Sequence, residues 1–139
     1  MKKVDKKYLK SLLETPSVTG TEVKVASLVR ERLAPVADEI ETNVMGSVHA
    51  CLKGTGSAPS VMISAHMDEI GLMVTYISDS GYLSVAAVGG VDAAILPGMR
   101  VDVHTESGTY RGVVGRKPFT SLSPTNAKRL LRLKASLLI

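Results

Sequence analysis

The sequence of 139 residues has no tryptophan, one phenylalanine and one cysteine, and it lacks a long apolar run. Its single cysteine, Cys51, cannot form an internal disulfide, which is consistent with a reducing compartment. No segment reaches the roughly 20 apolar residues that a membrane-spanning helix needs, and the lysine-rich start of the chain does not resemble a signal peptide. We therefore expect a cytoplasmic protein that makes no membrane contact.

Acidic residues are missing from the last part of the chain. None follows Glu106, whereas residues 116–139 contain six lysines and arginines, and residues 1–10 contain five lysines against one aspartate. The formal net charge of +4 thus divides into +10 at the two ends and −6 between them. Net positive charge concentrated in two end segments around an acidic middle, with only one phenylalanine and four tyrosines for base stacking, is not typical of a nucleic-acid-binding surface. We expect no nucleic-acid partner.

The chain does contain enough apolar sequence for a core, at 45% of all residues. Residues 6–14 place leucines at helical spacing, and a Thr-Pro pair ends this predicted helix. A second helix is predicted around Thr19 and Glu22, which have the spacing of a capping box, and it stops before Pro35. The apolar stripe of this helix consists of Val25, Leu28, Val29 and Leu33.

Two segments in the first half of the chain are predicted to be strands. Residues 43–54, NVMGSVHACLKG, alternate between apolar and polar, which indicates a strand with one solvent-exposed face. Residues 60–65, SVMISA, form a nearly continuous apolar run, typical of a strand covered on both faces in an α/β sheet. Because ligands bind at the carboxyl ends of the strands in open α/β sheets, the residues directly after this run are candidates for a site.

Residues 71–116 change to a pattern of short β-hairpins. The turns Asp79-Ser80-Gly81 and Glu106-Ser107-Gly108 each separate two strand-like runs and place glycine where a left-handed backbone is needed. These residues predict a small antiparallel sheet or barrel inserted after the α/β part. A short basic helix is predicted from Ser123 toward Leu133, and the final apolar residues, LLI, predict an element that ends before it is packed.

The stretch SAHMDEIG, residues 64–71, sets His66, Asp68 and Glu69 within four positions at the end of the predicted buried strand. A histidine with an aspartate two residues later is a familiar arrangement for a metal ligand. The imidazole binds the ion, and the carboxylate orients the ring or a bound water. The spacing also permits a histidine that is only hydrogen-bonded at a sheet edge. Both interpretations remain open from these residues alone.

Two other catalytic arrangements are disfavoured by geometry. Adjacent residues of an extended chain point to opposite faces, so Asp68 and Glu69 do not form a glycosidase pair, which must face one gap of ~5–9 Å. His49 and Cys51 lie roughly 7 Å apart on a strand, too far for a thiol and its base, and we expect Cys51 to be a buried or half-buried free thiol. His49 and His104 are expected to be ordinary surface residues.

Six segments resemble, in order and approximate spacing, the TET-type dinuclear metallo-aminopeptidases: ETPSVTGTE, VMISAHMDEIGLMV, VGGVD, LPGMRVDVHT, GVVGRKP and LSP. This family includes glutamyl and deblocking aminopeptidases and proteins labelled cellulase M or endoglucanase. The resemblance covers nearly the whole chain and is most specific at AHMDEIG. It implies an α/β fold in which residues 1–70 are the N-terminal part of a zinc-aminopeptidase-like catalytic domain. Residues 71–139 are then a β-rich, small-barrel dimerisation insert that ends before the chain returns to the catalytic sheet.

The resemblance also implies a site and its chemistry. His66 matches the first metal ligand of the family, and Asp68 matches the aspartate behind it that tunes the catalytic site without ligating. In the family, a pair of zinc or cobalt ions activates a water molecule that attacks the peptide bond next to the free amino terminus of a short peptide. The β-rich insert of the family mediates dimerisation and assembly into dodecameric shells, so a homo-oligomer is implied.

The remaining ligands of the family have no counterpart in this sequence. The family requires a bridging aspartate, a Glu-Glu pair, a further acid and a final histidine, all after the insert in chain order, but no acidic residue follows Glu106. One imidazole and one orienting carboxylate leave a divalent ion mostly hydrated, so we expect at most one weakly bound ion. The chain is therefore expected to be a truncated or interrupted aminopeptidase that is inactive alone.

The sequence is compatible with three functions. The first is a metal-dependent aminopeptidase acting on short peptides, of which this chain holds one part. The second is a non-catalytic self-association or interaction module derived from such a peptidase. The third, a small peptide-binding barrel unrelated to metallopeptidases, requires AHMDEIG to be a coincidence.

Overall fold

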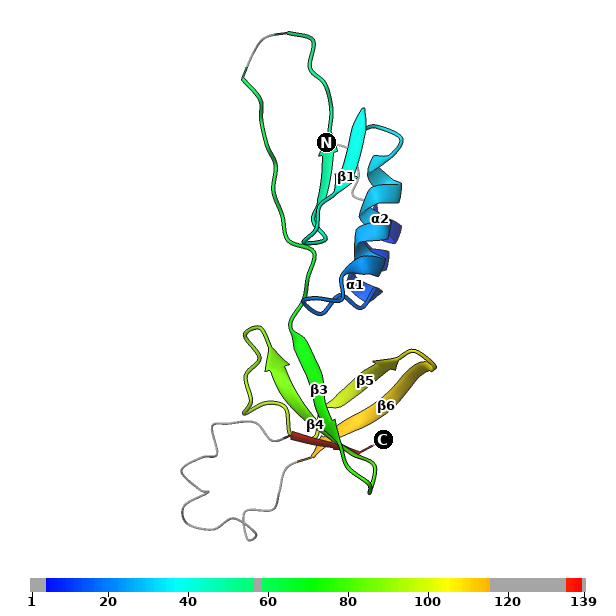
Figure 1. Ribbon diagram of the computed structural model, residues 1–139, viewed down its shortest axis with the longest axis vertical. Coiled ribbons are helices and arrows are strands. Elements are labelled where there is room, and N and C mark those ends of the chain that lie inside the picture. The colour runs from blue at the N-terminus through cyan, green and yellow to red at the C-terminus, as the bar shows by residue number, and fades with distance from the viewer. Residues whose placement is uncertain (1–4, 57–58, 116–134, 139) are drawn as a thin grey trace. The chain divides into compact units, whose positions relative to one another are not determined.

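The computed structural model describes residues 5–56, 59–115 and 135–138. The chain forms two compact units, Met1–Glu69 and Ile70–Ile139 (Figure 1). Within the described ranges, neither helix has the length and apolar character needed to cross a membrane.

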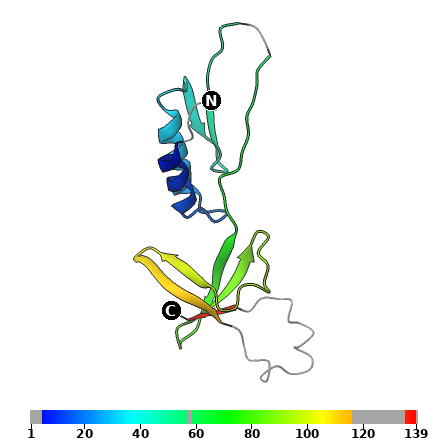
Figure 2. The same ribbon diagram turned by 180° about the vertical axis from the view of Figure 1, so that it is seen from behind.

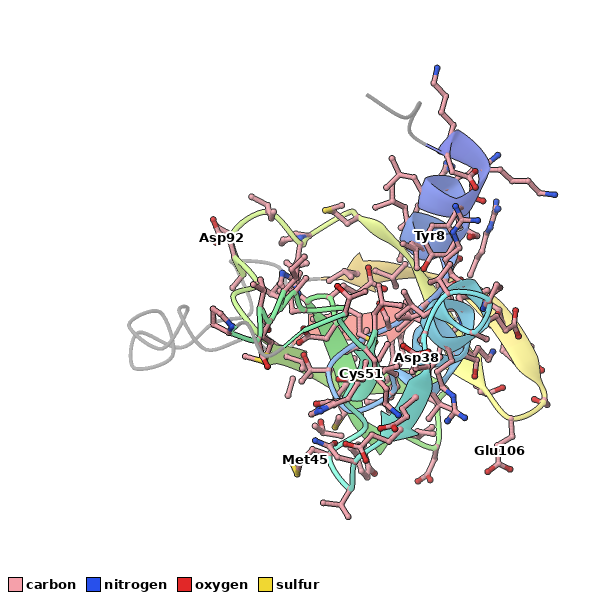
Figure 3. The ribbon with its side chains drawn as sticks, turned by 90° about the horizontal axis from the view of Figure 1, so that it is seen from above. Tyr8, Asp38, Met45, Cys51, Asp92 and Glu106 are labelled. Carbon is pink, nitrogen blue, oxygen red and sulfur yellow. The ribbon has the colours of Figure 1, made fainter. Side chains whose placement is uncertain are left out.

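The first unit contains two helices, α1 (Lys6–Glu14) and α2 (Val23–Leu33), both where the spacing of apolar residues predicts them. Asp5 caps α1, because its carboxylate accepts a hydrogen bond from the backbone N–H of Tyr8 at 3.1 Å. Arg32 of α2 reaches this end of α1. Its guanidinium lies 3.3 Å from the Asp5 carboxylate and 5.1 Å from the centroid of the ring of Tyr8, which is labelled in Figure 3. The two helices are thus joined by a cation–π contact and an ion pair.

The predicted capping box at the start of α2 is wrong. The helix is preceded by Glu22, whose side chain makes no hydrogen bond to the helix; its Oε1 instead accepts from the N–H of Gly20 at 2.8 Å. Thr19 lies three residues before this boundary, and its hydroxyl donates to the carboxylate of Asp68 at 2.8 Å. A Thr-x-x-Glu spacing does not distinguish a helix cap from a loop whose threonine bonds a residue far away in sequence, because both use the same side-chain chemistry.

Two strands, β1 (Glu39–Thr42) and β2 (Val48–Cys51), form a two-stranded antiparallel sheet. Asn43 closes the turn between them, because its side-chain oxygen accepts hydrogen bonds from the N–H groups of Met45 and Ser47, each at 3.0 Å. Strand β2 lies inside the predicted strand of residues 43–54. Strand β1 was not predicted, because its sequence, EIET, has a single apolar residue and no pattern from which a buried face could be inferred.

Residues 60–65, predicted to be a strand covered on both faces, adopt no regular secondary structure, so this prediction is wrong. The side chains of Val61, Met62 and Ile63 are 87%, 88% and 94% exposed. The segment belongs to the long open connection between β2 and β3 (Figure 1). A strand buried on both faces needs neighbouring strands and a covering layer on each side, and none of the residues that the structure describes pairs with this one.

The second unit is a five-stranded antiparallel sheet with the order β3-β4-β7-β6-β5 (Figures 1 and 2). The two predicted hairpins are confirmed, since β3 pairs with β4 and β5 pairs with β6. Gly81 has a φ of 82° in the first turn, the left-handed conformation that favours glycine. The strands are β3 (Gly71–Ile77), β4 (Tyr82–Val88), β5 (Arg100–Thr105), β6 (Gly108–Gly115) and β7 (Ala135–Leu138).

Strand β7 joins the two hairpins into one sheet. It pairs antiparallel with β4 on one side and with β6 on the other. The expectation that the last apolar residues form an unpacked element is therefore wrong for residues 135–138, whose backbone has a partner strand on each side. The predicted helix at residues 123–133 lies outside the described residues.

The core of the second unit lies on one face of this sheet. Alternate residues of a strand point to the same face, so β4 and β6 each bury every second side chain over part of their length. Val114 of β6 is the most buried, at 1% exposure. The buried cluster consists of Leu83, Val85, Leu96, Val103 and Val114.

Candidate functional site

The predicted site lies in the first unit, in the extended segment that follows residues 60–65. This segment runs beside the connection between α1 and α2, where Val18 and Glu69 form a parallel β-bridge. The N–H of Glu69 donates to the carbonyl of Ser17 at 2.9 Å, and the N–H of Thr19 donates to the carbonyl of Glu69 at 3.3 Å. Two stretches about fifty positions apart are therefore held side by side by their backbones.

His66 and Asp68 contact each other directly. The Nδ1 atom of His66 is 3.1 Å from Oδ1 of Asp68 and 3.1 Å from the backbone carbonyl oxygen of the same residue. The other carboxylate oxygen of Asp68, Oδ2, accepts the hydroxyl of Thr19 at 2.8 Å. The three side chains form a linear series in which Asp68 stands between the hydroxyl and the imidazole.

The charge state of Asp68 follows from these contacts. The Thr19 hydroxyl, with smaller contributions from the backbone and from His66, holds the pKa of the Asp68 carboxyl below its ordinary value. The carboxylate is then ionised at neutral pH and can only accept hydrogen bonds. Because both oxygens near Nδ1 are acceptors, we assign the proton of the neutral imidazole to Nδ1.

The opposite ring atom, Nε2, is the one that the site presents to solvent. The His66 side chain is 86% exposed, and within residues 5–56 and 59–115 no hydrogen-bond partner lies at Nε2. A histidine that donates from one nitrogen to a carboxylate and offers the lone pair of the other is the usual geometry of a metal-ligating imidazole. The arrangement can bind a cation at Nε2 and can orient the ring toward it.

Glu69 has a different role from Asp68. Its Oε1 accepts the backbone N–H of Ser17 at 3.0 Å, and Ser17 is 5% exposed, so this contact fixes the segment against the α1–α2 connection. The two neighbouring carboxylates thus bind different residues.

The remaining predicted or rejected candidates lie apart from this site. Cys51 is exposed on β2, so the expectation of a buried or half-buried thiol is wrong; the two-stranded sheet leaves that residue uncovered in the described part of the chain. His49 lies 3.8 Å from Glu41, its cross-strand neighbour. His104 contacts the hydroxyl of Thr109 at 3.0 Å. Both histidines are exposed, as expected of surface residues.

The described residues do not fit a complete metal centre. Among them, no group of three or more histidine, cysteine, aspartate or glutamate side chains is placed to hold an ion. His66 supplies one nitrogen and Asp68 an orienting carboxylate, whereas zinc sites use three or four protein ligands. No hydrolytic step can therefore be derived from this chain's donors alone.

Thr19 and Ser17 are the site residues that the sequence reasoning missed. The sequence pattern predicts a helix cap at Thr19 and gives no role to Ser17, yet both residues contact the segment that carries His66. A sequence signal existed, because both lie in the ETPSVTGTE segment on which the family resemblance partly rests.

Comparison with known proteins decides the family. The model of the M42 glutamyl aminopeptidase family matches residues 46–137, which include His66, Asp68 and most of the second unit. The chain belongs to the M42 glutamyl aminopeptidase family. The resemblance inferred from the sequence motifs is thereby confirmed.

Individual M42 relatives are similar over most of this chain but are much longer. A lysyl aminopeptidase of Pyrococcus furiosus is 44% identical over 116 residues, which are 83% of this chain and 33% of the relative. The crystal structure of a TET aminopeptidase from a marine sediment Thaumarchaeota archaeon is 32% identical, with a TM-score of 0.83, over 96% of this chain and 37% of that one. This M42 chain thus spans about a third of the length of the curated relatives that it matches.

A third similarity concerns assembly. The TET1 peptidase of Pyrococcus horikoshii, described as able to assemble into a tetrahedron or a large octahedral shell, matches 96% of this chain and 46% of its own, with a TM-score of 0.69 and 26% identity. Together with the TET aminopeptidase, it confirms the predicted fold class, an α/β part followed by a β-rich part.

Proposed function

We propose that this chain supplies the first metal-ligand position of an M42 aminopeptidase centre, which removes N-terminal residues from short peptides. The observation that carries the proposal is the His66 ring, whose Nδ1 lies 3.1 Å from Asp68 and whose Nε2 is directed to solvent. In this role His66 is the ligand, and Asp68 acts through it by orienting the ring. Membership of the M42 family supports the reaction class.

The two units would divide the work of such an enzyme as the predicted domains do. Residues 1–70 would be the N-terminal part of the catalytic domain, which carries His66 at its end. Residues 71–139 would be the β-rich dimerisation insert. We propose the cytoplasm as the compartment, in keeping with a single unpaired and exposed cysteine.

The complete centre of the family binds two divalent ions, zinc or cobalt, which lower the pKa of a bound water and polarise the peptide carbonyl. This chain alone would bind at most one ion, and bind it weakly. One imidazole replaces a single water of the ion's hydration shell, and the remaining positions stay hydrated.

Titration with zinc tests the ligand role of His66. We expect isothermal calorimetry of the whole chain to give a small heat of weak 1:1 binding, and we expect His66→Ala to remove this heat because the Nε2 donor is lost. His104→Ala is the matched control, since His104 is also exposed but bonds a threonine hydroxyl in the second unit. Equal heats for the wild type and His66→Ala, or an equal loss in both variants, would contradict the proposal.

Self-association is a second candidate function, favoured by the outer strand β3. This strand forms one edge of the described sheet and exposes a series of apolar side chains, Met73, Val74, Tyr76 and Ile77. An exposed apolar edge strand offers both unpaired backbone groups and hydrophobic area to another chain. We therefore propose that β3 contributes to a homo-oligomeric contact.

Light scattering tests this contact. The wild-type chain is expected to be a dimer or larger, and Ile77→Lys is expected to shift it toward the monomer, because a charge replaces buried apolar area in the contact. Thr75→Lys adds the same charge to the same strand without removing an exposed apolar side chain, so its effect should be smaller. A wild-type chain that is monomeric at all concentrations would exclude the contact.

A further inference from the structure

The connection between α1 and α2 contacts the His66 segment in two separable ways. The backbones of Ser17 and Thr19 bond the backbone and side chain of Glu69, which determines where the segment lies. The Thr19 side chain contacts the carboxylate of Asp68, with Oγ1 2.8 Å from Oδ2. The position of the His66 segment and the orientation of the Asp68 carboxylate are thus controlled by different atoms.

The Thr19 hydroxyl restricts the rotation of the Asp68 carboxylate about its terminal torsion. The terminal torsion of aspartate is broad, so the carboxylate plane rotates easily unless both oxygens are engaged. Here Oδ2 accepts from Thr19 and Oδ1 faces Nδ1 of His66 at 3.1 Å. A hydrogen bond to an ionised carboxylate is stronger than one between neutral groups, so the hydroxyl favours this rotation over the others.

We infer that Thr19 is a positioning residue that acts through Asp68 on His66 and selects the tautomer with the proton on Nδ1. This tautomer leaves the lone pair on Nε2, the exposed ring nitrogen. The inference rests on the proposed function in one respect only, which is that Nε2 binds a metal ion. The tautomer itself depends on the Asp68 carboxylate that Thr19 orients and on the Asp68 backbone carbonyl oxygen, which also lies 3.1 Å from Nδ1, and it needs no ion.

The tautomer can be measured directly on the whole chain. Nitrogen-15 NMR of the imidazole at a pH where the ring is neutral gives the ratio of the Nδ1–H to the Nε2–H form, and His66→Ala identifies the signal. Thr19→Val keeps the shape of the side chain but lacks the hydroxyl, and we expect it to lower the ratio by roughly 2- to 10-fold, the equivalent of one net hydrogen bond. Thr19→Ser, which keeps the hydroxyl, is expected to retain the wild-type ratio. Thr19→Ala also lacks the hydroxyl and replaces the valine variant if that protein does not fold.

Thr21→Val is the matched control for a general loosening of the loop. The hydroxyl of Thr21 donates to the carbonyl of Val18 at 2.6 Å in the same connection but does not contact Asp68. A ratio unchanged in the hydroxyl-free Thr19 variant, or changed equally in Thr21→Val, would overturn the inference.

Failure of this inference and failure of the proposed function are distinguishable. The zinc titration asks whether Nε2 binds an ion, whereas the NMR ratio is measured without metal. A tautomer shift in Thr19→Val together with zinc heats unaffected by His66→Ala would leave the positioning role standing and remove the ligand role.

Discussion

Replacing Val114 by aspartate is expected to unfold the β-rich second unit. Val114 is 1% exposed and lies in the cluster formed by strands from both hairpins. A carboxylate there would be buried without a partner, which costs about 3–5 kcal/mol, and the apolar contacts of the valine would be lost as well. Because small domains are stable by only about 5–15 kcal/mol, a change of this size removes most or all of the stability.

Urea denaturation followed by circular dichroism measures this effect. Val113→Asp provides the control, because Val113 is the preceding residue of the same strand and is 45% exposed. Its carboxylate remains solvated, so the unfolding midpoint should change little. Midpoints that fall equally in the two variants would show that the assigned face of β6 is not the core face.

The chain supplied with zinc or cobalt is expected to show no aminopeptidase turnover above a metal-only blank. No group of three or more histidine, cysteine, aspartate or glutamate side chains is placed to hold an ion in the described residues, and the sequence has no acidic residue after Glu106. A hydrolytic centre needs an ion with fixed ligands, so that the pKa of its water falls, and a carboxylate that moves the proton. Neither requirement is met by one imidazole.

Release of a chromophore from amino-acid anilides is a suitable assay for this prediction. The lysyl aminopeptidase of Pyrococcus furiosus, which is about three times as long as the segment it shares with this chain, serves as the positive control. Turnover by the 139-residue chain that a chelator abolishes would contradict the prediction, because it would require ligands that the described residues do not provide.

Local patterns predicted the local elements of this protein well. The helices α1 and α2 and both hairpins of the second unit lie where leucine spacing and glycine-containing turns place them. These signals are reliable because they act within one element: the period of the apolar residues and the left-handed backbone at Gly81 do not depend on distant parts of the chain.

Apart from the missed strand β1, the main errors concern contacts between distant segments. Thr19 was taken for a helix cap because its partner, Asp68, is 49 positions away. Residues 60–65 have the composition of a buried strand, but the described residues provide no strand or layer to cover them. The final apolar residues, LLI, are predicted to remain unpacked, but the described ones, Leu137 and Leu138, belong to β7, which lies between β4 and β6.

Local patterns in the sequence specify the type of most elements and the chemical identity of the His66–Asp68 pair, and the sequence motifs specify the family of the chain. The orientation of that pair depends on the fold, because the hydroxyl of Thr19 bonds Asp68 from another part of the chain and the backbone of Ser17 bonds the adjacent Glu69. Spacing along the chain specifies which chemical groups can form a site. The direction of a side chain, the tautomer of a histidine and the burial of a residue depend on the distant segments that pack against them.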